Sequence, residues 1–348
     1  MSTYYDKDKF KRKSIKDAVE DFKEYKKRLD AGDITMIKTC YQSINNMGHD
    51  GFHPGTINCI AGHSGTGKTT LLNNIITTIP KFNKNTRVLM LSLEMPSRSL
   101  VARNLSRFSR NTVKDITINK KYEELDHTIL EKLEKLPIDY IEIAGDATET
   151  ATNIAGYLSE YKDWSVFVAL DHSLLIEGND DASKIAELVN HFNILRKKFP
   201  NSTYLILSQL NDAMQEKDRI YQRIKMYPSY TDLYQGRKLY HICDTVIVLN
   251  KPSTYLSDTT YGNQNLPLYF DSKDLLGNPI KIPIIYAHCI KGRDSGTQIA
   301  AFADNLHFNE FEELDISKLA KPSNITTKST TTKKTKKTSS SEGYLNFD

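Results

Sequence analysis

Short, continuous apolar runs recur along the middle of the chain, and segments with helical spacing separate them. Apolar runs of this kind are typical of strands that are buried on both faces of a sheet. We therefore expect buried parallel strands at TINCIAG (56–62), RVLMLSLE (87–94), WSVFVALD (164–171), TYLILSQ (203–209), TVIVLN (245–250) and IPIIYAHCI (282–290).

The helical spacing is clearest in residues 183–199. One stripe of that segment carries Ile185, Val189, Phe192, Leu195 and Phe199. Helices that alternate with buried strands predict an α/β fold, in which helices cover both faces of a mostly parallel central sheet. We expect residues 34–318 to form this one domain. Residues 251–283, rich in Tyr, Asn, Pro and Gly, are predicted to be an inserted loop or hairpin.

The polar segment before this domain, residues 1–33, contains a helical pattern at SIKDAVEDFKEYKKRL (14–29). Ser14 and Asp17 have the spacing of a capping box. The apolar residues of the pattern fall on one face of the predicted helix: Ile15, Val19, Phe22 and Leu29. This face packs either on the core of its own chain or on a neighbouring subunit.

Residues 319–348 differ in composition from the rest of the chain. The stretch KPSNITTKSTTTKKTKKTSSS is rich in Lys, Thr and Ser and lacks apolar anchors, so we predict a disordered tail. Any contact of its lysines with nucleic acid would be non-specific and weakened by salt. The acidic and aromatic stretch EGYLNFD (342–348) follows. This region is either a solvated tail or a peptide that docks on a partner.

Composition limits the classes of protein to which this chain can belong. Among 348 residues, 39% are hydrophobic and 26% are charged, which fits a globular protein. The net charge of +4 is too small to indicate nucleic-acid binding by itself. No apolar stretch is long enough to cross a bilayer, and no secretory signal is found. The four scattered cysteines predict neither disulfides nor a zinc site, so a reducing cytoplasm is expected: Cys40, Cys59, Cys243 and Cys289.

The stretch AGHSGTGKTT (61–70) has the spacing of a phosphate-binding loop. Its glycines let backbone N–H groups turn toward phosphate oxygens, and the helix expected next directs its positive end at the same anion. Lys68 can reach the β- and γ-phosphates, and Thr69 can ligate Mg²⁺. The predicted nucleotide-binding residues are Gly62, His63, Ser64, Gly65, Thr66, Gly67, Lys68, Thr69 and Thr70.

Two acidic residues end predicted strands, at the edge of the sheet where ligands bind in α/β folds. Glu94 can polarise the water that attacks a γ-phosphate. Alternatively, it is a surface residue at the start of a helix that has Pro96 at its first position. Asp171 ends VFVALD, and we expect it to hold Mg²⁺ together with Thr69.

Polar residues end two further strands. Gln209 can contact the γ-phosphate and report its loss, or it is an ordinary polar strand end. Lys291 and Arg293, in IKGRDSG (290–296), lie two positions apart, so both side chains can point the same way. No anion in the same chain is evident for this pair. We therefore predict that the pair completes a neighbour's nucleotide site as an arginine finger, and surface charge is the alternative.

In order and spacing, these pieces resemble the ATPase domain of DnaB-type replicative helicases, which has a RecA-like P-loop NTPase core. The combination of SLEM, SQL and KGR-x-x-G is specific. The resemblance covers roughly residues 50–304, in GTINCIAGHSGTGKTTLLNNII, VLMLSLEMPSRSLVARNLS, VFVALDHSLLI, LRKKFPNSTYLILSQLN, YPSYTDLYQGRKLYHICDTVIVL and IKGRDSGTQIAAF.

The resemblance implies a homo-oligomeric ring, usually a hexamer, that encircles single-stranded DNA. It implies hydrolysis of ATP or another NTP with Mg²⁺ between subunits, and travel from 5′ to 3′. The helix at 14–29 would be the linker helix that docks on the adjacent subunit. The implied catalytic residues are Lys68, Glu94, Asp171, Gln209, Lys291 and Arg293, with Thr69 and Asp171 as metal-binding residues.

The DNA-binding loop of the family, S-D-L-R-E-S-G, corresponds here to TDLYQGR (231–237). Tyr234 can stack on a base, Arg237 can meet the phosphate backbone, and Gln235 lies between them. Only about 33 residues precede the ATPase domain, so we expect no N-terminal collar domain, the part that contacts primase in the family. A compact ring helicase without a collar resembles a phage protein acting in the host cytoplasm.

Several partners and two alternative functions follow from the resemblance. A primase, a loader or a single-strand-binding protein are the partners to consider, and no membrane is expected. A RecA- or RadA-like recombination ATPase shares the core but builds filaments. A loader or scaffold would bind nucleotide and DNA without unwinding.

Overall fold

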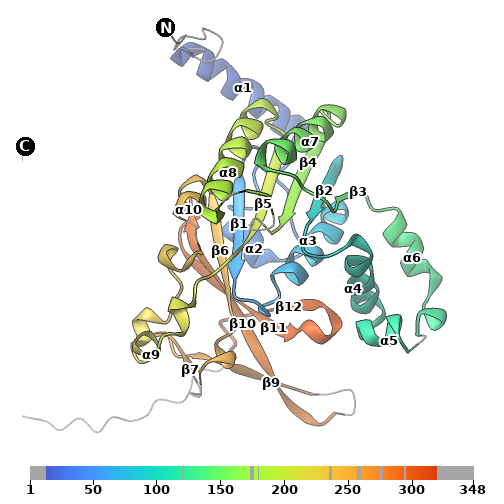
Figure 1. Ribbon diagram of the computed structural model, residues 1–348, viewed down its shortest axis with the longest axis vertical. Coiled ribbons are helices and arrows are strands. Elements are labelled where there is room, and N and C mark those ends of the chain that lie inside the picture. Colours follow the sequence, from blue (N-terminus) through green and yellow to red (C-terminus); the bar gives the residue numbers. More distant parts are fainter. Residues whose placement is uncertain are drawn as a thin grey trace, which may run out of the picture.

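The computed structural model describes residues 13–119, 121–172, 176–178, 180–234, 237–256, 260–273, 277–293 and 295–319. A ten-stranded sheet forms the centre of this part of the chain (Figure 1). Its strand order is β12-β11-β10-β6-β1-β5-β4-β2-β3, and β9 pairs with β10 alone. A separate two-stranded sheet contains β7 and β8.

One half of the sheet is parallel and comprises β1 (Ile57–Gly62), β2 (Thr86–Ser92), β3 (Ile138–Ile141), β4 (Ser165–Asp171), β5 (Ser202–Gln209) and β6 (Thr245–Asn250). The remaining strands are β7 (Thr260–Tyr261), β8 (Leu266–Pro267), β9 (Tyr269–Lys273), β10 (Pro279–Gly292), β11 (Gln298–Asn305) and β12 (Glu310–Leu314). Each of these pairs in antiparallel fashion. All six runs predicted as strands are strands.

The predicted direction of the last run, 282–290, is wrong. This run lies in β10, which is antiparallel to β6. Parallel neighbours need a crossover, usually an α-helix, and no α-helix lies among the described residues between these two strands. The hairpin β7–β8 and the strand β9 lie there instead, so residues 251–283 contain hairpins, as one alternative predicted. The sequence analysis missed β3, β11 and β12.

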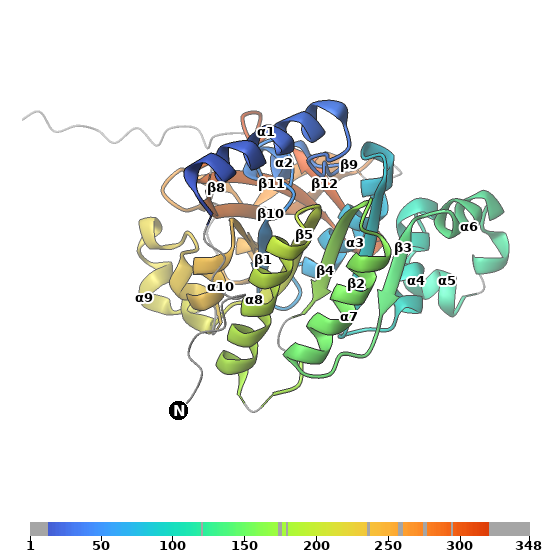
Figure 2. The same cartoon turned by 90° about the horizontal axis from the view of Figure 1, so that it is seen from above.

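Helices cover both faces of the sheet, as predicted. The α-helices are α1 (Ile15–Ala31), α2 (Gln42–Met47), α3 (Lys68–Phe82), α4 (Ser97–Ser109), α5 (Val113–Thr117), α6 (His127–Glu134), α7 (Ala147–Glu160), α8 (Asp181–Lys198), α9 (Lys217–Ile220) and α10 (Arg237–Ile242). One hydrophobic core lies between the sheet and α7, α8 and α10, and another lies between the sheet and α2, α3 and α4. Figure 2 shows α7 and α8 on one side of the strands and α3 on the other.

The stripe predicted on α8 faces the first of these cores. Ile185, Val189, Phe192 and Leu195 are buried, whereas Phe199 lies just beyond the helix and is half-buried. Every second side chain of β4 and β5 packs on the same core, while the alternate side chains pack on the opposite one. A strand buried on both faces explains the continuous apolar runs.

The first helix leaves its apolar face uncovered. The capping box is present, because Ser14 and Asp17 exchange backbone N–H bonds with each other's side chains at 2.9 and 3.1 Å. No residue of α1 is buried, and Ile15 and Phe22 are 83% and 65% exposed. Packing of this face on the core of its own chain is therefore not observed at Ile15, Val19 and Phe22, whereas Leu29 is half-buried. Figure 1 shows α1 at the end of the domain where β4 and β5 begin.

The predicted disordered tail lies outside the described residues from position 320 onward, and so does EGYLNFD. In the described part of the chain, none of the helices combines the length and the apolar content needed for a membrane span.

Candidate nucleotide-binding site

The predicted phosphate loop joins β1 to α3, which is the strand–loop–helix context that such a loop requires. Two glycines are needed for its shape. A Cβ at Gly62 would come within 2.6 Å of the Thr66 hydroxyl oxygen. Gly67 has a φ of 85°, and a Cβ there would meet Leu306 and Phe311 at 2.8 Å. Any larger residue would displace the loop from the turn before α3.

The loop is closed by its own hydrogen bonds. The Lys68 ammonium donates to the carbonyl oxygens of Gly62 and His63 at 2.8 and 3.1 Å. Thr66 also donates to His63, through its hydroxyl group, at 2.8 Å. Burial lowers the pKa of Lys68 from its usual value. The ammonium therefore lies folded onto the loop, at the N-terminal end of α3.

Thr69 and Asp171 form the centre of the predicted metal site. The Thr69 hydroxyl donates to Asp171 Oδ2 at 2.7 Å. The other carboxylate oxygen, Oδ1, is buried and has no hydrogen-bond partner among the described residues. Burial raises the pKa of Asp171 to about 6; the Thr69 hydrogen bond opposes the rise and the Glu94 charge adds to it. A buried carboxylate with an unsatisfied oxygen beside a hydroxyl suits the water-rich shell of Mg²⁺.

Glu94 lines the same cavity as Thr69. Its backbone N–H and that of Leu93 donate to the Asp171 carbonyl oxygen, at 3.3 and 2.9 Å. The Glu94 side chain is 51% exposed, and its carboxylate oxygen lies 3.9 Å from His172 Nε2. His172 in turn lies 3.3 Å from the Gln209 side-chain nitrogen. Pro96 is the N-cap of α4 and not its first helical residue, so that detail of the surface alternative is wrong, whereas the exposure of Glu94 just before this helix agrees with it.

These residues surround one cavity of about 350 Å³. Of the predicted residues, Ser64, Gly65, Gly67, Lys68, Thr69, Thr70, Glu94 and Gln209 line it. Gly62, His63, Thr66 and Asp171 do not line it, although Asp171 is hydrogen-bonded to Thr69, which does. The sequence analysis missed Arg103 of α4, together with Leu306 and Asn309 from the turn between β11 and β12. The one feature of the sequence that could have predicted Arg103 as a cavity residue is its position on the helix that directly follows Glu94.

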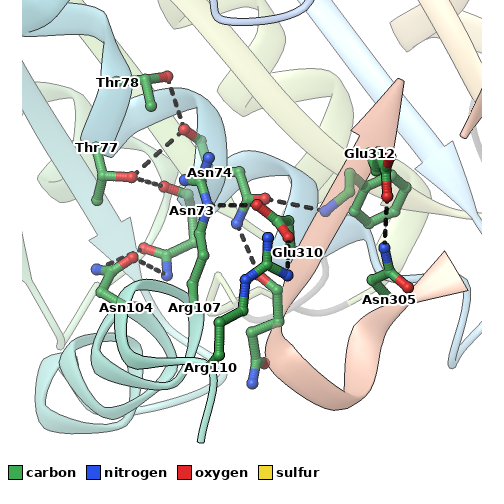
Figure 3. A network of polar contacts seen from close by, with 12 residues as sticks. Asn73, Asn74, Thr77, Thr78, Asn104, Arg107, Arg110, Asn305, Glu310 and Glu312 are labelled. Carbon is green, nitrogen blue, oxygen red and sulfur yellow. Dashed lines mark hydrogen bonds and ion pairs between the residues drawn. The ribbon is translucent and has the colours of Figure 1, made fainter. Parts of the chain in front are cut away.

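A network of asparagines holds the surrounding helices in place (Figure 3). Asn73 of α3 donates to the Asn104 side chain of α4 at 2.9 Å. Asn74 donates to the Asn309 carbonyl oxygen at 2.9 Å and accepts from the Phe311 N–H at 3.2 Å. All of these side chains except that of Asn309 lie almost fully buried, at 3% exposure or less. The helix that begins with Lys68 is thereby fixed to the helix that carries Arg103 and to the β11–β12 turn.

Lys291 and Arg293 lie far from this cavity. The Lys291 ammonium donates to the carbonyl oxygens of Tyr240 and His241 at 2.6 and 3.0 Å. Arg293 pairs with Asp244 at 2.8 Å, so the expectation that no anion of the same chain is available is wrong for Arg293. Asp244 precedes β6 and also accepts from the Ile57 N–H at the start of β1. The predicted phosphate loop follows the other end of β1, about 17 Å away for a strand of this length.

The predicted DNA-binding residues are only partly described. Gln235 lies outside the described residues, as does the side chain of Arg237, the first residue of α10. Tyr234 is 36% exposed, and its hydroxyl group donates to Asp181 at 3.3 Å. The Tyr234 backbone N–H donates to the Gln209 carbonyl oxygen at 3.0 Å. The loop is thus attached directly to the strand end that borders the nucleotide cavity.

Comparison with known proteins gives one family and a set of similar folds. The model of the DnaB-like helicase C terminal domain matches residues 36–290. A solved structure of a single ATPase domain has 16% identity and a TM-score of 0.68, over 88% of this chain and 100% of that one. No curated protein matches the sequence.

Two further solved structures share the fold. One, entitled "The Structure Of A DnaB-Like Replicative Helicase And Its Interactions With Primase", has 16% identity and a TM-score of 0.66, over 88% of this chain and 68% of that one. The other is a KaiC-like protein from Pyrococcus horikoshii, with 14% identity and a TM-score of 0.50, over 81% of this chain and 100% of that one. At these identities, the likeness establishes a shared RecA-like fold.

Proposed function

The chain belongs to the DnaB-like helicase C-terminal domain family, whose members are ATP-hydrolysing helicases, and from this premise we propose that it is a ring-forming motor on single-stranded DNA. Each active site would combine the nucleotide cavity of one subunit with Lys291 and Arg293 of the next. DNA replication is the process that such a motor serves.

Within one subunit, the cavity can bind and activate a nucleoside triphosphate. Lys68 would exchange its two loop carbonyls for β- and γ-phosphate oxygens. Thr69 and Asp171 would hold Mg²⁺, which supplies positive charge against the phosphates. Glu94 would orient the attacking water and accept its proton, since its carboxylate is half exposed and lines the cavity. Gln209 would sense the γ-phosphate from the end of β5.

The position of Arg293 is the single observation that carries the proposal of a shared site. Arg293 lies at the edge of the sheet opposite its own phosphate loop, so it cannot reach a nucleotide bound in the same chain. Its side chain is 54% exposed, whereas that of Asp244 is only 11% exposed and is also paired with Arg196 at 2.8 Å. Asp244 would therefore keep a cationic partner when Arg293 turns to a neighbour's phosphate. A guanidinium that can reach a γ-phosphate only in another subunit is what a trans-acting finger requires.

The uncovered face of α1 supports ring assembly. Exposed Ile15, Val19 and Phe22 form an apolar stripe on a capped helix that buries none of its own residues. Burying such a stripe against a second copy would gain roughly 1.5–3 kcal/mol for each large side chain. Heterologous contacts of this kind close into rings when the rotation between subunits allows it. We infer that α1 docks on the adjacent subunit.

The contact between Gln209 and Tyr234 supports coupling to DNA. Hydrolysis changes the ligand at the Gln209 end of β5, and the Tyr234 backbone is hydrogen-bonded to that same residue. Leu210 and Leu233 form the adjoining bridge, so the loop follows the strand end as one unit. Tyr234 would stack on a base, and the loop would move along the strand as the nucleotide state changes.

Strand separation on a forked DNA tests this function. The wild type is mixed with ATP, Mg²⁺ and a labelled fork, beside Glu94→Ala and the matched surface variant Glu131→Ala of α6. We expect unwinding by the wild type and by Glu131→Ala, and none by Glu94→Ala. DNA-stimulated hydrolysis without unwinding, together with filaments in electron micrographs, would favour a recombination ATPase. Hydrolysis and DNA binding without unwinding or filaments would favour a loader or scaffold.

A further inference from the structure

A second cavity lies at the opposite edge of the sheet from the nucleotide cavity, where β4 and β5 begin. Its volume is about 430 Å³, within the range of about 300–1,000 Å³ that is usual for ligand sites. Arg28 from the last turn of α1 lines it and donates to the Asn201 side chain at 3.3 Å. The proposed helicase reaction gives this cavity no role.

The cavity carries an excess of positive charge. Arg28, Lys162 and Lys198 line it, against one carboxylate, that of Asp163. Both lysines are exposed, and neither has an ion pair within the described ranges. Lysines that end a helix or follow one offset the negative end of its dipole, which accounts for part of this charge. Three cations in one cavity nevertheless attract a ligand that bears carboxylates.

Aromatic side chains form the apolar part of the same cavity. Tyr161, Trp164 and Phe199 line it, and Trp164 remains 38% exposed. Arg87 lies over the Tyr161 ring at 4.1 Å and over the Trp164 ring at 5.8 Å, and Asp139 holds Arg87 at 2.8 Å. The indole therefore lies beside a guanidinium that Asp139 holds, and it still borders the cavity. Trp, Tyr and Arg are enriched among the residues that dominate binding at protein interfaces.

We propose that this cavity binds EGYLNFD, residues 342–348 of the same chain. Tyr344, Leu345 and Phe347 supply rings and an aliphatic side chain for the aromatic wall, and Glu342 and Asp348 supply carboxylates for the cations. A larger cavity of about 680 Å³ borders Tyr230, Tyr240 and Ile316. No charged side chain lines that cavity, so it does not match the two carboxylates.

The length of chain allows this contact. Residues 320–341 separate Leu319 from the segment and can span up to about 75 Å. A domain of about 300 residues has a radius of gyration of only about 19 Å. A tether of this length gives an effective concentration on the order of 1 mM, so a free-peptide Kd of about 100 µM would leave the cavity about 90% filled.

Fluorescence of Trp164 tests the proposal, because it is the sole tryptophan of the chain. Acrylamide quenching is compared between the full-length wild type, a variant with Tyr344→Ala, Leu345→Ala and Phe347→Ala, and a control with Thr330, Thr331 and Thr332 changed to Ala. We expect stronger quenching in the first variant only. Adding the peptide EGYLNFD to that variant should restore protection, whereas a scrambled peptide should not.

Charge reversal locates the site. Lys162→Glu and Lys198→Glu are added to the triple Tyr344/Leu345/Phe347 variant. They should weaken peptide binding by at least about fivefold, because the loss of a single exposed ion pair can already cost that much and two cations are reversed. Circular dichroism checks that the variants fold. Equal quenching in the wild type and the tail variant would overturn the proposal. So would peptide binding that is unchanged by the two lysine substitutions and weakened by Tyr230→Ala. Protection that a dT oligonucleotide provides and the peptide does not would also overturn it. The readout involves neither ATP nor unwinding, so its failure leaves the proposed motor untouched.

Discussion

The Thr69 hydroxyl and the Asp171 carboxylate, 102 positions apart in the sequence, are joined by a hydrogen bond of 2.7 Å. The first side chain belongs to the second residue of α3, and the second ends β4. Under the proposed function, their contact places a hydroxyl and an acid where Mg²⁺ would accompany the phosphates. Substitutions at either residue therefore test the proposed metal site.

Thr69→Val should weaken Mg²⁺ binding in the ATP complex by about 10–100-fold, since valine keeps the shape and removes the oxygen. The measurement is the Mg²⁺ concentration that gives half-maximal ATP hydrolysis with single-stranded DNA. Thr69→Ser, which keeps the hydroxyl, is the matched control and should stay near the wild type. A normal Mg²⁺ requirement in Thr69→Val would exclude the hydroxyl as a ligand.

Asp171→Asn should stabilise the protein without nucleotide at high pH. The pKa of Asp171 is raised from 3.8 to about 6, mainly by burial. The folded state therefore binds this proton more tightly than the unfolded state. The contribution of this proton to the free energy of unfolding is fully present below about pH 4 and is lost as pH rises through 6. The loss amounts to up to about 3 kcal/mol.

Urea unfolding between pH 4.5 and 8 measures this effect. Asparagine does not ionise, so its advantage over the wild type should grow across that window and then level off. A free-energy difference between the two proteins that is independent of pH would show that Asp171 does not titrate there.

Arg103→Ala should lower ATP turnover by about 100-fold, with a smaller effect on ATP affinity. Arg103 lines the cavity beside Glu94 and Lys68, and it has no ion pair within the described ranges. A free cation there can stabilise charge that develops in the transition state. Arg98→Ala, at an exposed position in the first turn of α4 and outside the cavity lining, serves as control for helix stability. If both variants lose turnover equally, Arg103 acts through the helix rather than on the nucleotide.

Tyr234→Ala should weaken binding of single-stranded DNA by about 1–3 kcal/mol, because a stacking surface is lost. Fluorescence anisotropy with a labelled dT oligonucleotide in the presence of a non-hydrolysable ATP analogue measures it. Tyr234→Phe keeps the ring and loses only the hydroxyl bond to Asp181, so it should bind nearly as well as the wild type. Tyr122→Ala, which removes another exposed tyrosine from a distant part of the chain, is the control. Unchanged affinity in Tyr234→Ala would place the DNA contact elsewhere.

The elements that the sequence predicted well are those with a local cause. Buried strands such as β4 appear as continuous apolar runs, and the phosphate loop needs glycines at fixed spacing. Strand direction has no such signature, which is why β10 was predicted with the wrong orientation. The short strand β3 and the acidic β12 lack a continuous apolar run, so they were missed.

The pattern of the sequence does not predict contacts between segments that lie far apart in the chain. Leu306 reaches the nucleotide cavity because the β11–β12 turn packs on Gly67. Arg293 meets Asp244 because an antiparallel strand returns to the start of β6. Both depend on how the strands are ordered in the sheet.

Mixing two inactive variants tests whether each active site is shared by two subunits. Glu94→Gln lacks the proposed base but keeps Arg293, and Arg293→Ala lacks the finger but keeps Glu94. We expect each variant alone to bind ATP and to hydrolyse almost none with single-stranded DNA. Rings assembled from equal amounts should regain hydrolysis, because about a quarter of their interfaces combine an intact Glu94 with an intact Arg293. Full hydrolysis by Arg293→Ala alone, or no recovery in rings shown to contain both chains, would contradict the shared site.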